Sequence, residues 1–131
     1  MALTYEIDPL DGVIRLLRTH HPSFMEWRGF VESVLIDPAF HPGLAILDDR
    51  RADREAPPRA EVEAVAAWIR ANAERLGSVK WAIVLDSSAK AAYGMARAAE
   101  FLADNSGVKW RVFTSYDDAR TWATRAERAT T

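Results

Sequence analysis

Apolar positions along this chain fall into short continuous runs and longer helical stripes, and the two kinds alternate from end to end. The runs at 4–8 and 13–19 flank the segment Asp8-Pro9-Leu10-Asp11-Gly12, whose proline and Asp-Gly pair are typical of a tight turn. This arrangement predicts an antiparallel hairpin. Three further strands are predicted at 44–47, 80–85 and 108–113.

Apolar residues at helical spacing occupy the intervals between these runs. In the clearest case Val62, Ala66 and Ile69 share one stripe, and Pro57-Pro58 delays the start of that helix to Arg59. Helices are predicted at 22–36, 59–76, 88–105 and 115–122. The order β-β-α-β-α-β-α-β-α, without repeat or linker, predicts one domain over residues 1–131. That domain is an open, mixed α/β sheet of about five strands, in which right-handed crossovers make the strands after the hairpin parallel.

Composition narrows the class of protein. The chain has 131 residues, 49% of them apolar, and 17 basic against 19 acidic side chains give a net charge of −2. No basic cluster stands apart from interleaved acids, so a nucleic-acid partner is not expected. The absence of cysteine excludes disulfides and thiolate metal sites. No signal peptide and no run long enough for membrane insertion are seen, which predicts a cytoplasmic protein.

The turns that follow the parallel strands are expected to meet at one edge of the sheet, where open α/β sheets bind ligands. Polar side chains gather in these turns. The candidate ligand-binding residues are His20, His21, Asp48, Asp49, Arg50, Asp86, Ser87 and Ser88.

Two chemical interpretations of these residues are weak. A hydrolase triad can be drawn from His20 or His21, with Ser87 or Ser88 and with Asp48 or Asp86. However, no Gly-x-Ser-x-Gly motif surrounds either serine. The histidines at 20, 21 and 41 lack the spacing of metal ligands. We therefore predict no catalytic residue, no metal site and no cofactor, and a protein that is not an enzyme.

Two segments leave alternatives open. The Asp86-Ser87-Ser88 sequence is typical of a helix cap, yet with Arg50 or Arg51 opposite it is also suited to a phosphate or carboxylate. The highly charged stretch 48–61 is either a plain solvated loop or a lid or partner-binding segment.

The helix predicted after Ser88 has a second face, on which Tyr93, Arg97 and Phe101 recur at every fourth position. Aromatic residues and arginine are enriched in interface cores, so this face is a candidate contact with a protein partner or a second copy in a homodimer. The alternative is that the last helix or the tail covers it. Core packing explains most of the five tryptophans, and an apolar pocket for a lipid-like ligand would use the same residues.

The segments Tyr5-Glu6-Ile7 and Gly12-Val13-Ile14-Arg15, with the helical segment Ala92-Tyr93-Gly94-Met95-Ala96-Arg97, resemble stand-alone bacterial STAS/SEC14-like proteins. The order of elements over the whole chain is similar to their SpoIIAA-like fold. In anti-sigma-factor antagonists of the STAS family, a serine after the third strand is phosphorylated and switches partner binding. The corresponding stretch here, 48–61, contains neither Ser nor Thr.

The resemblance and the missing catalytic pattern lead to one expectation: a non-enzymatic STAS-like regulatory or protein-binding module without the phosphorylatable serine. The alternative is a carrier or sensor of a small apolar or acidic, lipid-like ligand, which rests on the SEC14 kinship and the converging turns.

Overall fold

The computed structural model describes residues 3–8, 10–42, 44–53, 55–77, 79–90, 93, 94, 97 and 108–125. The strands are β1 (Leu3–Asp8), β2 (Val13–Arg18), β3 (Ala45–Asp49), β4 (Lys80–Val84) and β5 (Lys109–Phe113). The helices are α1 (Phe24–Leu35), α2 (Arg59–Ala71), α3 (Ala73–Leu76) and α5 (Tyr116–Thr124). Among these residues, no helix has both the length and the apolar character needed to cross a membrane.

The five strands form one mixed sheet whose spatial order follows the chain, β1-β2-β3-β4-β5. β1 pairs antiparallel with β2, which confirms the predicted hairpin, and Gly12 adopts a positive φ of 68° in its turn. The pairs β2–β3, β3–β4 and β4–β5 are parallel, as predicted. The α/β class and the five-stranded mixed sheet predicted from the sequence are therefore confirmed.

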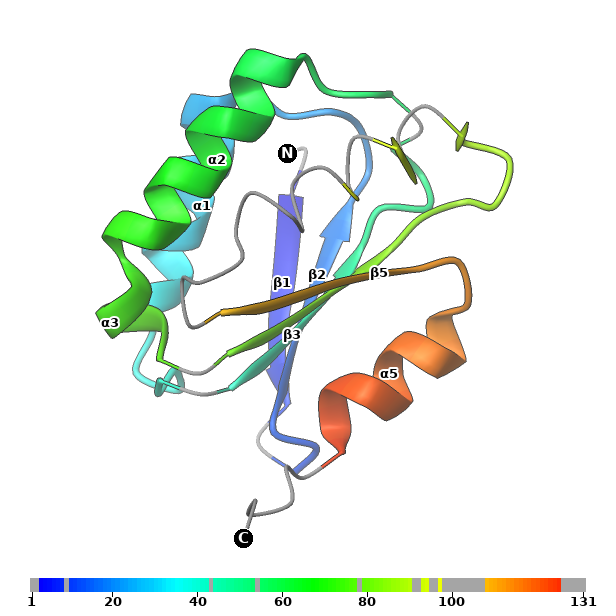
Figure 1. The fold of residues 1–131 in the computed structure, drawn as a ribbon. Coiled ribbons are helices and arrows are strands. Elements are labelled where there is room, and N and C mark those ends of the chain that lie inside the picture. The colour runs from blue at the N-terminus through cyan, green and yellow to red at the C-terminus, as the bar shows by residue number, and fades with distance from the viewer. Residues whose placement is uncertain are drawn as a thin grey trace, which may run out of the picture.

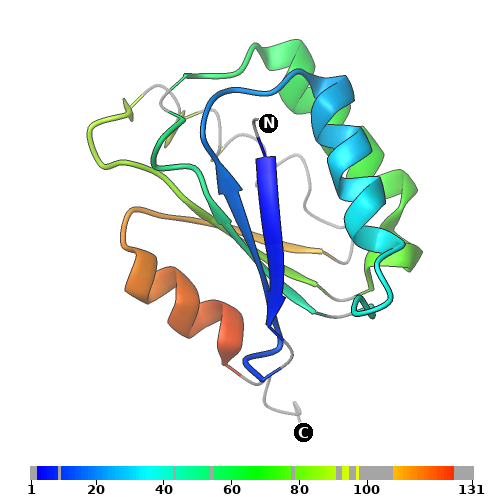
Figure 2. The same cartoon turned by 180° about the vertical axis from the view of Figure 1, so that it is seen from behind.

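The sequential strand order decides where the helices lie. Right-handed crossovers that always step to the next strand place their helices on the same face of the sheet. Accordingly α1 and α2 lie side by side on one face, and α5 covers the other (Figures 1 and 2). The first turns of α1 and α2 lie at the end of the sheet where the parallel strands finish (Figure 1).

Side chains alternate between the two faces with period two. Toward α1 and α2, the buried apolar residues include Ile14 and Leu16 of β2, Ile46 of β3 and Trp81 of β4. The core on the α5 face is built mainly from small residues: Val13, Ala45, Leu47, Ala82, Val84, Ala119 and Ala123. On this face, the row of side chains from β2 ends in Arg18 and the row from β3 ends in Asp48. These two charged residues belong to the site described below.

Three predicted elements differ from the structure. The helix predicted at 59–76 is interrupted at Asn72, whose backbone (φ −114°, ψ 19°) leaves the helical region, and both its backbone N–H and its side-chain amide donate to the Trp68 carbonyl oxygen, at 3.0 Å and 2.9 Å. The strand predicted at 44–47 continues to Asp49, so Asp48 lies inside a strand and not in a turn. In the helix predicted at 88–105, residues 90, 93, 94 and 97 are helical, and most of the others lie outside the described residues.

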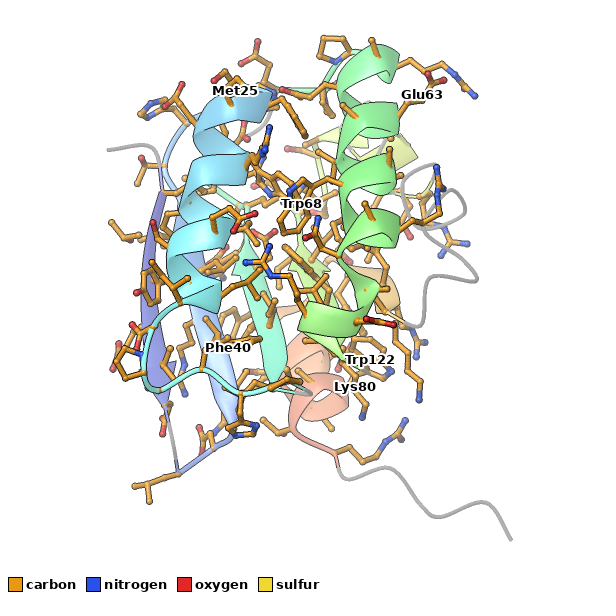
Figure 3. All side chains as sticks on the ribbon, turned by 90° about the vertical axis from the view of Figure 1, so that its left-hand side faces the viewer. Met25, Phe40, Glu63, Trp68, Lys80 and Trp122 are labelled. Atoms are coloured by element: carbon orange, nitrogen blue, oxygen red, sulfur yellow. The ribbon has the colours of Figure 1, made fainter. Side chains whose placement is uncertain are left out.

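Four of the five tryptophans form a row of ring contacts through the core on the α1/α2 side of the sheet. Trp27 contacts Trp68 and Trp81, with ring centroids 5.3 Å and 6.1 Å apart, and Trp81 contacts Trp110 at 4.8 Å. Figure 3 shows Trp68 between α1 and α2. Core packing thus accounts for these tryptophans, although Trp27 also borders the pocket described next.

Candidate functional site

A pocket lies between the first turns of α1 and α2, at the edge where the parallel strands end. The segment after β3 closes one side of it, because Asp53, Glu55 and Pro57 are among the lining residues. Its apolar wall consists of Phe24, Trp27, Val62, Val65 and Leu85. Its charged lining consists of Arg18, His21, Arg50, Asp53, Glu55 and Glu61.

The enclosed space limits what the pocket can bury. Its cavity volume is about 50 Å³. Since a single water needs a cavity of roughly 10–15 Å³, the space admits a group of a few heavy atoms, such as a carboxylate or a phosphate. This enclosed volume is too small to bury the acyl chain of a lipid, and the charged lining is better matched to a small polar group.

Arg18 is a buried cation with little compensation. The residue is 4% exposed, and its Nη1 donates to Asp53 Oδ2 at 3.5 Å, the outer limit of a hydrogen bond. Its Nε is buried and has no partner among the described residues. Burial, assisted by the charge of Arg50, lowers the pKa of Arg18 from 12.5 to about 10. Because each pKa unit corresponds to ~1.4 kcal/mol, keeping this side chain charged costs about 3 kcal/mol.

Beneath the pocket, Asp48 is fully buried and holds Arg50 in place. One of its oxygens, Oδ2, accepts from Arg50 Nε at 3.0 Å, from Arg50 Nη2 at 2.9 Å and from Trp81 Nε1 at 3.1 Å. Burial raises the pKa of Asp48, but the charges of Arg50 and Arg18 outweigh it, and the net shift is downward. Asp48 is therefore ionised, and its closest cationic partner is Arg50.

His21 lies between two carboxylates. Its Nδ1 is 3.2 Å from Asp53 Oδ2 and its Nε2 is 2.7 Å from Glu61 Oε2. A neutral imidazole has one N–H to donate, so it can donate to only one of these two carboxylates. The lone pair of its other ring nitrogen then faces the second carboxylate.

The predicted ligand-binding residues are divided by the structure. His21 and Arg50 line the pocket and Asp48 supports it from below. The other members lie outside the lining: His20 is exposed with Nδ1 3.3 Å from the Thr19 hydroxyl, and Asp49 pairs with Arg51 at 2.7 Å.

The predicted group at 86–88 lies outside this lining too. Asp86 Oδ1 accepts from the backbone N–H and the hydroxyl of Ser88, and Ser87 and Ser88 are exposed. This is the local bonding of a turn at a helix start, which favours the capping interpretation. Among the described residues His21 does not form the hydrolase triad, because both of its ring nitrogens face carboxylates, and the Nδ1 of His20 lies beside the Thr19 hydroxyl.

The stretch 48–61 is a wall of the pocket. Asp53 within it is 5% exposed and contacts Arg18 and His21 across more than thirty residues of chain. Of the predicted interface, Tyr93 is 37% exposed and Arg97 is exposed, while Phe101 lies outside the described residues.

Sequence reasoning missed Arg18, Asp53, Glu55 and Glu61. A signal for Arg18 was present, because it continues the alternating row Ile14-x-Leu16-x-Arg18 toward the covered face of the sheet. No local pattern marks the three carboxylates, since only the folded path of the segment after β3 brings them to His21.

Comparisons with protein-family models, with curated proteins and with solved structures found no match. No family is assigned to the chain, and the resemblance to STAS/SEC14-like proteins stays a prediction. Function is therefore inferred from the geometry of the pocket.

Proposed function

We propose that this protein is a non-enzymatic carrier or sensor of a small acidic ligand, whose carboxylate or phosphate group binds beside Arg18. The single observation that carries the proposal is the state of that side chain. A guanidinium has five N–H donors, and among the described residues this one makes a single hydrogen-bond contact, at 3.5 Å, although the residue is 4% exposed. An anion that supplies acceptors offsets a desolvation cost that the protein alone leaves largely unmet.

Two neighbouring features support an anion in this place. The first turn of α2 (Arg59–Ala71) borders the pocket, and its N-cap residue, Pro58, has no side chain that caps the first N–H groups, so the positive end of the helix dipole lies near the pocket. The apolar wall around Trp27 and Val62 excludes water, which strengthens a charge-assisted hydrogen bond. The mouth is open, so the rest of a larger acid extends into solvent.

The test is calorimetric titration with acetate, pyruvate and inorganic phosphate. We expect at least one of these to bind, and Arg18→Met to weaken that binding at least tenfold, which is ~1.4 kcal/mol. The matched control is Arg51→Met, since Arg51 is an exposed arginine paired with Asp49 outside the pocket lining. Absence of binding for all three acids, or equal affinity of the wild type and Arg18→Met, would reject the proposal.

Native mass spectrometry of protein purified from its own host identifies the natural ligand. An adduct of a few hundred daltons or less that carries an acid group and is lost on denaturation is the expected result. An adduct that persists in Arg18→Met would place the ligand elsewhere.

The regulatory alternative, a STAS-like module that contacts a protein partner or a second copy, rests on the exposed pair Tyr93 and Arg97. Sedimentation of the wild type and of Tyr93→Ala tests it. We expect a dimer that the substitution dissociates, and a strictly monomeric wild type at high concentration would remove the homodimer.

A further inference from the structure

A set of metal-ligand atoms lies at the mouth of the pocket. One nitrogen of His21 and one carboxylate oxygen each from Asp53 and Glu55 lie within 4.8 Å of one another. We propose that these three residues bind one divalent metal ion of the zinc type. Imidazole nitrogen with carboxylate oxygen is a donor set that zinc accepts, and three protein ligands leave a fourth position open.

The spacing requires a small adjustment. Ligand atoms around a tetrahedral zinc ion lie about 3.4 Å apart, since each is about 2.1 Å from the metal. The widest separation of 4.8 Å must therefore shorten by about 1.4 Å. Glu55 is exposed and rotates freely enough to supply this movement, whereas Asp53 is fixed by burial.

Glu61 acts as the positioning residue. Its Oε2 is 2.7 Å from His21 Nε2, so it accepts the N–H of that nitrogen and leaves the lone pair of Nδ1 directed at Asp53 Oδ2, 3.2 Å away. Two acceptors at this distance repel each other unless a cation lies between them. A carboxylate that orients a metal-bound histidine from its far nitrogen is a recurring second-layer arrangement in metal sites.

The local charge also calls for a divalent cation. Asp53, Glu55 and Glu61 contribute three negative charges around His21, and Arg18 contributes one positive charge. The positive charge of Arg50 is balanced by the negative charge of Asp48, with which it forms an ion pair. With a neutral imidazole, three negative charges against one positive leave −2, which a divalent ion cancels.

Metal binding does not depend on the proposed function, but the three carboxylates oppose an anion beside Arg18, and a bound divalent ion would reduce that opposition. The ion and Arg18 would share Asp53 as a neighbour, so an anion entering the pocket would meet two cationic groups. If both proposals hold, zinc tightens acetate binding to the wild type.

The test uses chelator-treated wild-type protein, titrated with zinc chloride in a buffer without carboxylate or phosphate. We expect one ion per chain, and cobalt(II) in place of zinc should give the intense visible absorption of a four-coordinate site. We expect zinc binding to weaken at least tenfold in each of three variants, His21→Gln, Asp53→Asn and Glu55→Gln. Because Glu55 is exposed, Glu55→Gln should leave the fold intact. The control His20→Gln replaces the adjacent exposed histidine and should change affinity less than twofold.

Glu61→Gln separates positioning from mere structural support. We expect it to weaken zinc about tenfold and to alter the cobalt spectrum while thermal stability stays near that of the wild type. No binding of zinc by the wild type, or unchanged affinity in Glu55→Gln, overturns the proposal. Arg18→Met should bind zinc at least as tightly as the wild type, so loss of the anion and loss of the metal are told apart.

Discussion

Two buried cations lie on opposite faces of the same sheet, and their surroundings differ sharply. Lys80, at the start of β4 on the α5 side, donates through Nζ to the carbonyl oxygens of Trp122 at 3.1 Å and Arg125 at 2.6 Å. It also lies 5.5 Å from the Trp122 ring centroid, and Figure 3 shows the two side chains together. Arg18, on the α1/α2 side, makes the single 3.5 Å contact with Asp53.

Burial lowers the pKa of both side chains, but Lys80 has two close acceptors, whereas the acceptor that the described residues offer Arg18 is 3.5 Å away. The two acceptors of Lys80 belong to the carboxyl end of α5, where a cation is favoured by the helix dipole. The role of Lys80 is therefore to fasten α5 to the sheet. Arg18 has no equivalent pair of close acceptors among the described residues, and this difference is the basis of the proposed anion.

Among the substitutions that test this comparison, the largest effect on stability is expected at Asp48, which pairs with Arg50 on the same face of the sheet as Arg18. Asp48→Ala removes the acceptor of Arg50 and Trp81 and leaves buried donors unpaired, so the free energy of unfolding should fall by about 3–5 kcal/mol. Urea unfolding measures this. Asp49→Ala is the control, since its partner Arg51 is half exposed, and it should cost less than about 1 kcal/mol. Equal losses in the two variants would refute the account of the buried charges.

The two cations should respond to the same substitution with opposite signs. Lys80→Met loses two charge-assisted hydrogen bonds and should lower the free energy of unfolding by about 2 kcal/mol. Arg18→Met removes a poorly compensated charge and should raise it by about 1 kcal/mol in the absence of anion. Chemical unfolding of both variants in a non-coordinating buffer gives the two signs. A loss in Arg18→Met as large as that in Lys80→Met would make Arg18 a structural residue like Lys80.

A smaller, pH-dependent effect follows from the lowered pKa of Asp48. The folded protein favours its ionised form more than the unfolded chain does, so its contribution is complete above the ordinary aspartate pKa of about 4. That contribution is lost as the pH falls through the folded value. The free energy of unfolding should therefore decline less steeply below about pH 4 in Asp48→Asn than in the wild type. Equal slopes would show that Asp48 is not held ionised.

The fold was largely predictable because each element carries a local signal. The Asp-Gly turn and the apolar runs defined the hairpin and the parallel strands, and Ser23 caps α1 through a reciprocal bond with Glu26. What escaped prediction was the break at Asn72, where the backbone leaves the helical region although its N–H still donates to the Trp68 carbonyl oxygen.

The site was predictable only in part. The general rule for parallel sheets placed His21, Asp48 and Arg50 correctly at one edge. The same rule included Asp86 and Ser88, which bond to each other and lie outside the pocket lining. Asp53 could not be found from sequence spacing, because its contacts with Arg18 and His21 arise from tertiary folding alone.

The most direct test of the role of Arg18 compares the unfolding of wild type and Arg18→Met at increasing concentrations of acetate or phosphate, whichever binds more tightly. Without anion the variant should be the more stable protein by about 1 kcal/mol. At a hundred times the dissociation constant the anion should add about 2.7 kcal/mol to the wild type alone, so the order of stability reverses. Parallel curves that never cross would contradict the account, because they would show that the charge of Arg18 is not kept for an anion.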